Sequence, residues 1–206
     1  MSGKRVQDGV GGSPKRLEDG RFLTGLGSYV DDLSRSGMLF AALVRSPHAH
    51  ARIARIDARA AAQVEGFVRC ITAADVGTMT PIPVRIGADP SFTPHLQRPL
   101  ASEVARYVGE PVAVVLAKTR GGAEDAADLV DVEYEPLPVI ADAQAARSAD
   151  KVIARWDVGF GDVQSAFAKA DCIMRERFTV SRQTAVPIEP RGLVAKFDIR
   201  RRVLTI

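Results

Sequence analysis

Residues 111–117, Pro111-Val112-Ala113-Val114-Val115-Leu116-Ala117, form the most continuous apolar run of this 206-residue chain. A short run rich in valine, bounded by turn residues, is typical of a strand that is covered on both faces. Gly121-Gly122 interrupt the pattern, and residues 123–129 then predict a helix. A further strand is expected at 130–134. This order of strand, helix and strand indicates a domain that mixes both kinds of structure.

Upstream of this unit the pattern is similar. Strands are expected at 38–44 (MLFAALV) and 67–72 (FVRCIT), with a single helical turn at 73–76. Residues 58–64 are rich in alanine and predict a helix, with Asp57 as N-cap and Gly66 beyond its end. Residues 77–102 carry prolines at 81, 83, 90 and 94, so a long loop is expected there.

Downstream, Asp162 is a suitable N-cap for a helix at 162–169. Alternating apolar residues predict a strand at 172–180, and two more are expected at 193–197 and 203–206. The segments predicted from these patterns are a flexible arm at 1–14, an α+β domain at 15–140, a connector at 141–158 and an incomplete second domain at 159–206.

Composition narrows the functional classes. The chain is 46% hydrophobic and 26% charged, as in ordinary globular proteins, and its formal net charge is +3. Its arginines are scattered apart from Arg200-Arg201-Arg202, so nucleic-acid binding is not favoured. No apolar run suits a secretory signal or a membrane span, which predicts a cytoplasmic protein. Cys70 and Cys172 have no metal-ligand spacing and are expected to be buried free thiols.

Two histidines are the obvious candidates for a metal site. His48 and His50 would share one face of a strand and could meet one ion. His95, the remaining histidine, lies in the distant loop, so a structural role at a strand end is the favoured interpretation. Ser46 is too close to His48 in the sequence to form an activated nucleophile.

Other polar groups are equally weak candidates. Gly25-Leu26-Gly27 lacks the rest of a dinucleotide-binding motif. Glu133 and Glu135 share a strand face and Asp31-Asp32 are adjacent, but nothing in the sequence holds either pair in acid–base geometry. The residues therefore assign no catalytic group and no metal ligand, and they leave cofactor contacts open.

A series of motifs along nearly the whole chain carries a resemblance. They are Ser13–Asp19 (SPKRLED), Arg21–Gly25 (RFLTG), Tyr29–Asp32 (YVDD), Arg45–Ala51 (RSPHAHA), Val104–Val115 (VARYVGEPVAVV), Ala123–Ala127 (AEDAA), Val132–Pro138 (VEYEPLP), Gly159–Val163 (GFGDV) and Pro187–Gly192 (PIEPRG). In this order they resemble the start of the molybdenum-binding large subunit of the xanthine dehydrogenase, aldehyde oxidase and carbon monoxide dehydrogenase family. Glu189-Pro190-Arg191 is closest to the carbon monoxide dehydrogenase members.

The resemblance implies an α/β hammerhead domain with a mixed sheet and helices, followed by the start of a second, α/β, molybdopterin-binding domain. It implies an oxidoreductase that hydroxylates an aldehyde, a purine-like heterocycle or carbon monoxide, with water as the oxygen source. Molybdopterin would be the cofactor of the complete subunit, and flavin and iron–sulfur subunits or domains would be the partners. The family's essential glutamate base and most pterin contacts lie further downstream, so none is assigned here.

Two hypotheses follow. In the first, the chain is the N-terminal part of a molybdenum hydroxylase subunit, binds no cofactor alone and is inactive without the remaining molybdopterin-binding domains. In the second, it is a non-catalytic hammerhead scaffold or a truncated product that binds partner subunits. A downstream reading frame carrying those domains would favour the first. The substrate and the oligomeric state stay open.

Overall fold

The computed structural model describes residues 12, 15–85, 89–150, 152–187 and 189–206. They form two compact units. The larger spans Gly37–Met174, and the smaller combines the described residues up to Ser36 with Arg175–Ile206. The predicted arm at 1–14 lies, except for Gly12, outside the described residues.

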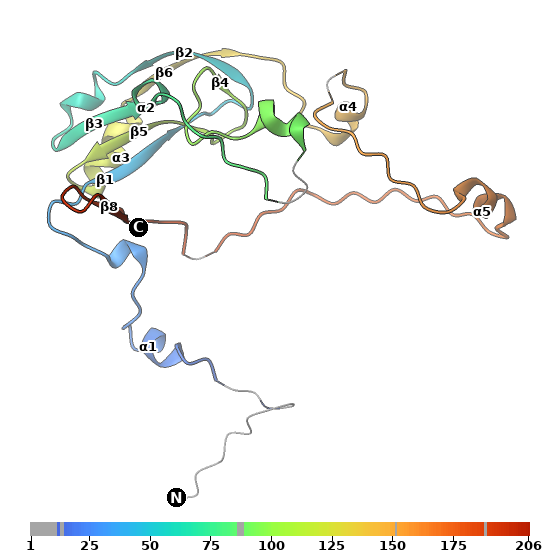
Figure 1. The fold of residues 1–206 in the computed structure, drawn as a ribbon, viewed down its shortest axis with the longest axis horizontal. Coiled ribbons are helices and arrows are strands. Elements are labelled where there is room, and N and C mark those ends of the chain that lie inside the picture. The colour runs from blue at the N-terminus through green and yellow to red at the C-terminus, as the bar shows by residue number, and fades with distance from the viewer. Residues whose placement is uncertain (1–11, 13–14, 86–88, 151, 188) are drawn as a thin grey trace, which may run out of the picture. The chain divides into compact units, whose positions relative to one another are not determined.

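The strand predicted at 111–117 is the centre of the first sheet. β5 (Pro111–Ala117) lies between β1 (Phe40–Arg45) and β3 (Phe67–Thr72) and runs antiparallel to both (Figure 1). None of its seven residues is exposed, and Val112, Ala113, Val115 and Ala117 are fully buried. The expected double-sided burial is therefore confirmed.

A second sheet was only partly anticipated by the sequence. β2 (Ala51–Asp57) lies between the short β4 (Val104–Ala105) and β6 (Asp131–Pro136), again antiparallel to both. The strand expected at 130–134 appears as β6, whereas the patterns did not single out β2 or β4. These two sheets together with helices confirm the α+β class.

Helix α3 (Arg120–Asp128) covers β1 and β5. Thr119 caps it, because its hydroxyl accepts the N–H of Gly122 at 3.0 Å. The helix predicted at 123–129 is therefore present, but it begins three residues earlier, so that Gly121 and Gly122, which follow the end of the apolar strand, lie in its first turn. Small residues allow the close packing: Ala126 on α3 shares a buried cluster with Val115 of β5, Ala61 and Val130.

Between β2 and β3 the predicted helix at 58–64 is also wrong. One 3₁₀ turn, η2 (Ala61–Gln63), occupies part of this range. Asp57 ends β2 instead of capping a helix, and its carboxylate accepts the backbone N–H of Arg59 at 3.0 Å. That local bond favours a turn over an α-helix. The helical turn expected at 73–76 is confirmed as α2 (Ala73–Val76), closed by a capping box between Thr72 and Asp75.

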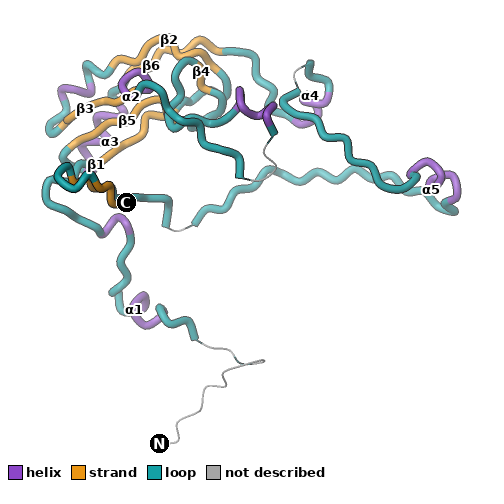
Figure 2. Tube along the Cα trace, in the orientation of Figure 1, coloured by secondary structure: helices purple, strands orange, loops and turns teal. Residues whose placement is uncertain are grey.

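The remaining part of the larger unit has little regular structure (Figure 2). The long loop at 77–102 contains the 3₁₀ segment η3 (Pro90–His95). The connector at 141–158 contains α4 (Ala143–Arg147), and the helix predicted at 162–169 is confirmed as α5 (Val163–Lys169), with Asp162 as its cap. Phe92 of η3 contacts Trp156, with ring centroids 5.5 Å apart.

The smaller unit contains α1 (Asp19–Leu23), the 3₁₀ turn η1 (Val30–Asp32) and a hairpin of β7 (Lys196–Asp198) and β8 (Val203–Thr205). The hairpin strands are shorter than the predicted 193–197 and 203–206. The strand expected at 172–180 is wrong: the backbone there has no strand assignment, because no neighbouring strand pairs with it in the described chain. Among the described residues, no helix has the length and apolar character needed to cross a bilayer.

Candidate functional site

The two most distinctive motifs of the sequence meet at one place, called here the motif junction: residues 45–51 and 106–111. Ser46 donates its backbone N–H to the carbonyl of Glu110 at 2.9 Å and accepts the N–H of Gly109 at 2.7 Å. The Arg45 guanidinium donates to the Gly109 carbonyl at 2.8 Å. Gly109 has a φ of +88°, which glycine adopts without strain. The junction thus joins the end of β1 to the start of β5.

Two buried polar side chains lie in this junction. Among the described residues, the buried polar and charged positions are Ser46, 2% exposed, and Glu110, 3% exposed. The Ser46 hydroxyl bonds to both the N–H and the carbonyl of His48, at 3.1 and 3.0 Å. The Glu110 carboxylate accepts the N–H of Arg106. Both side chains therefore satisfy backbone groups, which buried polar residues commonly do.

The histidine pair makes separate structural contacts. His48 and His50 lie in a bend that precedes β2, so they do not share a strand face. The His48 ring packs against Tyr134, with centroids 4.9 Å apart, and His50 donates through Nδ1 to the Pro138 carbonyl at 2.8 Å. His95 lies at the end of η3. In the described chain, no three histidine, cysteine or acidic side chains are grouped as a metal site.

Tyr134 has a buried polar atom that sequence reasoning missed. Its hydroxyl is buried and has no hydrogen-bond partner in the described structure. Burial raises the pKa of Tyr134, and the Ser46 hydroxyl is close enough to offset part of that rise, although the two hydroxyls do not meet the geometry of a hydrogen bond. The apolar-polar alternation of β6 could have indicated that this side chain faces inward, but it could not have shown the missing partner.

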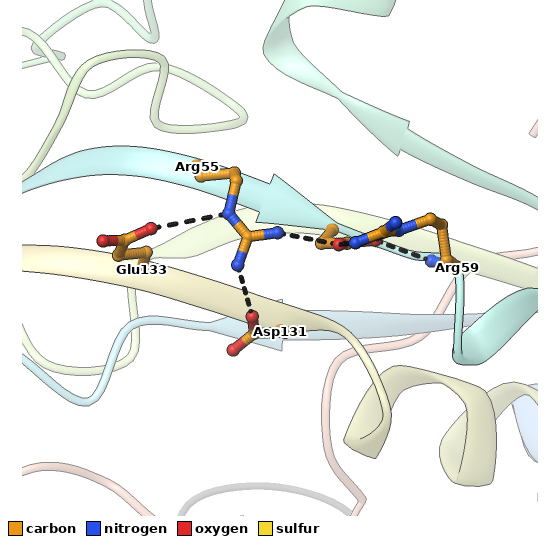
Figure 3. Close-up of polar contacts among 5 residues, drawn as sticks. Arg55, Arg59, Asp131 and Glu133 are labelled. Carbon is orange, nitrogen blue, oxygen red and sulfur yellow. Dashed lines mark hydrogen bonds and ion pairs between the residues drawn. The ribbon is translucent and has the colours of Figure 1, made fainter.

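The two glutamates predicted on one strand face are paired with arginines. Arg55 of β2 donates to Glu133 at 3.4 Å, to Asp131 at 2.9 Å and to Asp57 at 2.7 Å (Figure 3). Glu135 forms an ion pair with Arg52 at 3.3 Å. Both glutamates are therefore engaged in ion pairs and are not held as an acid–base pair.

The same network sets the charge states around Asp57. The guanidinium and backbone N–H of Arg59 hold the pKa of Asp57 well below its usual range. The hydrogen bond that Arg55 donates to Glu133 is the main reason why the pKa of Arg55 is raised. Both groups are therefore charged at any physiological pH, which suits a structural cross-strand brace and not proton transfer.

The other candidates lie apart from the junction in the chain. Asp32 accepts the N–H of Tyr29 at 2.9 Å, while Gly25 takes a φ of +73° in a turn. Cys70 is partly buried, and desolvation raises the pKa of its thiol. Cys172 is exposed, so the expectation that both thiols are buried is wrong for this residue.

In the smaller unit, Gly192 connects two further motifs. A Cβ atom at this position would lie 2.9 Å from Cγ1 of Val30, closer than side chains tolerate. Glycine is therefore required where the segment ending in Arg191-Gly192 passes Tyr29–Asp32. Glu189 and Arg191 themselves are exposed.

The two antiparallel sheets and α3 form the mixed architecture that the resemblance implied for a hammerhead domain. Residues 24–138 match the family model described as the aldehyde oxidase and xanthine dehydrogenase a/b hammerhead domain. Residues 145–206 match the molybdopterin cofactor-binding domain. The chain therefore belongs to the aldehyde oxidase and xanthine dehydrogenase family, as the resemblance in its motifs predicted.

Several relatives are similar over nearly the whole chain. The carbon monoxide dehydrogenase large chain of Afipia carboxidovorans is 37% identical, over 96% of this chain and 27% of that protein. The nicotine 6-hydroxylase large subunit of Paenarthrobacter nicotinovorans is 37% identical, over 92% of this chain and 24% of that protein. The crystal structure of quinoline 2-oxidoreductase from Pseudomonas putida 86 superposes with a TM-score of 0.78 and 38% identity, over 93% of this chain and 26% of that chain. This chain thus spans 24–27% of the length of these relatives.

Members of this family hold a molybdopterin cofactor. The solvent exposure of residues 145–206 indicates how far these residues could enclose it. No described residue between 145 and 206 is buried. Cofactors of this size are normally held in a concave site that covers most of their surface. Burial therefore assigns no pterin contact to the described residues of this region.

Proposed function

We propose that this chain supplies the hammerhead domain and the first part of the molybdopterin-binding region of a molybdenum hydroxylase large subunit. The observation that carries the proposal is the distribution of burial. Buried polar groups are concentrated at the motif junction, where Ser46 and Glu110 hold the backbone, while residues 145–206 present exposed surfaces. The chain's own contribution is architectural, and the reacting groups come from the remaining molybdopterin-binding domains.

In this proposal the complete subunit oxidises an aldehyde, a purine-like heterocycle or carbon monoxide, with water as the oxygen source. Bound molybdopterin supplies a redox-active metal centre. Flavin and iron–sulfur subunits or domains receive the electrons, and the assembly works in the cytoplasm. The names of the relatives support an oxidoreductase of this kind, because they include carbon monoxide, nicotine and quinoline enzymes.

A second candidate is a non-catalytic hammerhead scaffold that binds partner subunits. Large apolar side chains favour it, since Phe160 is 98%, Phe178 87% and Met174 84% exposed. Apolar groups so fully exposed are typical of surfaces that another polypeptide covers. Both candidates share this need for a partner and differ in whether the assembly holds molybdenum.

The test begins with the purified chain, in which molybdenum is measured by elemental analysis and pterin by fluorescence after oxidation. We expect a folded protein without stoichiometric cofactor. The chain is then co-expressed with the part of the carbon monoxide dehydrogenase large chain that follows the matched region. Recovery of a complex containing molybdenum supports the first candidate, and a complex without it supports the scaffold.

Two variants sharpen this experiment. Phe178→Asp places a charge on the exposed apolar surface and should reduce the yield of the complex. Glu176→Asp, two residues earlier on the same exposed segment, is the matched control and should leave the yield unchanged. Stoichiometric molybdenum in the isolated chain would contradict both candidates, because the site would then be self-sufficient.

A further inference from the structure

The second half of β2 has an open edge. β4 pairs with only the first two residues of β2, and the N–H of Ile53 then donates to the Glu103 carbonyl at 2.8 Å. The chain that precedes Glu103 turns toward β5 instead, because the N–H of Ala101 donates to the Pro111 carbonyl at 2.8 Å. Residues 54–57 therefore have β6 on one side and, in the described chain, no strand on the other.

The backbone of Ile56 faces this open edge. In an antiparallel pair, alternate residues direct their N–H and C=O groups toward the partner strand and away from it. Ile53 directs its N–H away from β6, and Ala54 has no counterpart on β6, so Ile56 is the next residue with this orientation. Among the described residues, no hydrogen bond is found for the Ile56 backbone on this side. Its N–H and C=O groups can therefore pair with another polypeptide.

A groove of about 270 Å³ lies beside the same edge. One water molecule takes up about 30 Å³ of liquid, so the groove has room for side chains of a short stretch of polypeptide. Alanines make up much of its wall, and their small side chains let another backbone approach β2 closely. The lining residues are Ile53, Ala54, Arg55, Ile56, Thr72, Ala73, Ala74, Ala101 and Ser102.

The charge of the groove indicates what kind of molecule it receives. Arg55 is the one charged residue among the described lining residues, and its guanidinium already bonds to Asp57, Asp131 and Glu133 (Figure 3). The groove thus offers no unpaired charge for an ion or a charged ligand. Exposed strand edges are commonly protected by charged side chains, whereas an uncharged open edge is suited to receive an extended segment as an added strand.

We propose that the open edge of β2 receives a short extended segment from the remaining part of the large subunit, which pairs with Ile56 as an added strand in line with β4. The segment continues an edge that β4 already uses, and its small uncharged side chains fill the groove. The remaining part of the subunit is its source because this chain spans only 24–27% of the length of its relatives. The inference rests on the proposed function, which makes this chain part of such a subunit.

Hydrogen exchange, measured by mass spectrometry with fragmentation that resolves single amides, tests this pairing. The isolated chain is compared with the complex obtained by co-expression with the part of the carbon monoxide dehydrogenase large chain that follows the matched region. We expect exchange of the Ile56 amide to slow by about tenfold or more in the complex, equivalent to about 1.4 kcal/mol. The Arg55 amide, which faces β6 by the same alternation, is the internal reference and should change little. Equal exchange of Ile56 in both samples would overturn the proposal, as would an isolated chain that dimerises and already protects Ile56.

A matched pair of variants tests the groove itself. Ala74 is an exposed residue in the groove wall, so Ala74→Phe should fill the groove and reduce the yield of the complex. Ala60→Phe makes the same change at an exposed alanine outside the groove and should leave the yield unchanged. Equal yields from the two variants would contradict the proposal, and the exchange of Ile56 in the natural chain decides if Ala74→Phe does not fold.

Failure of the proposed function has a different signature. In that case neither the natural chain nor Ala60→Phe forms a complex, and both proposals are overturned. A complex that contains molybdenum, but in which the Ile56 amide exchanges as fast as in the isolated chain, overturns the strand pairing alone.

Discussion

The backbone N–H of Ser46 donates to the carbonyl of Glu110 at 2.9 Å, across a separation of sixty-four residues in the sequence. This bond connects the residue that follows β1 to the residue that precedes β5. Both side chains at this contact are buried and both bond to nearby backbone groups. The two motifs are therefore parts of the same motif junction. Their serine, glycine and glutamate residues make the hydrogen bonds that hold it together.

Ser46→Ala should destabilise the motif junction. The hydroxyl of Ser46 satisfies the N–H and carbonyl of His48, and alanine leaves these partly buried groups without it. We expect the free energy of unfolding to fall by about 2 kcal/mol, measured by urea denaturation. Ser102→Ala is the control, since Ser102 is exposed, and it should change the stability little. Equal losses in the two variants would contradict a special role for Ser46.

Tyr134→Phe should have the opposite sign. The Tyr134 hydroxyl is buried without a hydrogen-bond partner, so its removal should raise the free energy of unfolding, by up to about 1 kcal/mol. Tyr107→Phe is the matched comparison, because the hydroxyl of Tyr107 accepts a bond from the side-chain amide of Gln97 at 2.5 Å. That variant should be neutral or less stable. Thermal unfolding of both variants tests this prediction. A lower melting temperature in Tyr134→Phe would show that the Tyr134 hydroxyl does have a hydrogen-bond partner.

The two adjacent glycines of α3 should respond differently to alanine. Nothing lies within 4 Å of a Cβ atom at Gly121, so Gly121→Ala should stabilise the chain by up to about 1 kcal/mol through helix propensity. A Cβ atom at Gly122 would lie 3.2 Å from the Glu65 carbonyl and 2.8 Å from the Thr119 hydroxyl. Gly122→Ala should therefore destabilise the chain. Chemical denaturation of both variants tests this, and the same sign in both would be incompatible with the packing described.

Asp75 should make stability depend on pH. Bonds from the N–H and hydroxyl of Thr72, together with Arg69, lower the pKa of Asp75 to about 2. A carboxylate with a lowered pKa stabilises the fold fully above its unfolded pKa of about 3.9 and loses this effect as the pH falls toward 2. The melting temperature of the natural chain should thus exceed that of Asp75→Asn at pH 7. The difference should shrink between pH 4 and 2, whereas a constant difference would indicate that the charge is irrelevant.

The parts of the fold that local patterns could predict are those with strong local signals. β5 is a continuous apolar run, β3 is flanked by turn residues, and Asp162 caps α5; all three appear where expected. The helix expected at 58–64 fails because Asp57 binds the N–H of Arg59 and favours a turn. The strand expected at 172–180 fails for a different reason, since a strand depends on a neighbour that no local pattern supplies.

The candidate site was less accessible to sequence reasoning. The motifs at 45–51 and 106–111 were recognisable, but their contact depends on the pairing of β1 with β5 and is not visible in either motif alone. The burial of Glu110 was equally hidden, because a glutamate beside Gly109 and Pro111 suggests a surface turn. Glu110 is an interior residue because distant segments cover this part of the chain: Ser46 bonds to its carbonyl, and Ala101 bonds to the carbonyl of the next residue, Pro111.

The central position of β5 also has a consequence for how the chain folds during synthesis. Among the strands of the described chain, β1 and β3 are separated from each other by β5 and pair with it alone. Both strands therefore leave the ribosome before their only partner has been made, and neither can close its hydrogen bonds until residues 111–117 emerge. Such long-range pairing is slow and leaves strand edges open meanwhile. We expect nascent chains that end before Pro111 to need a chaperone, and those extending past β6 to become resistant to protease.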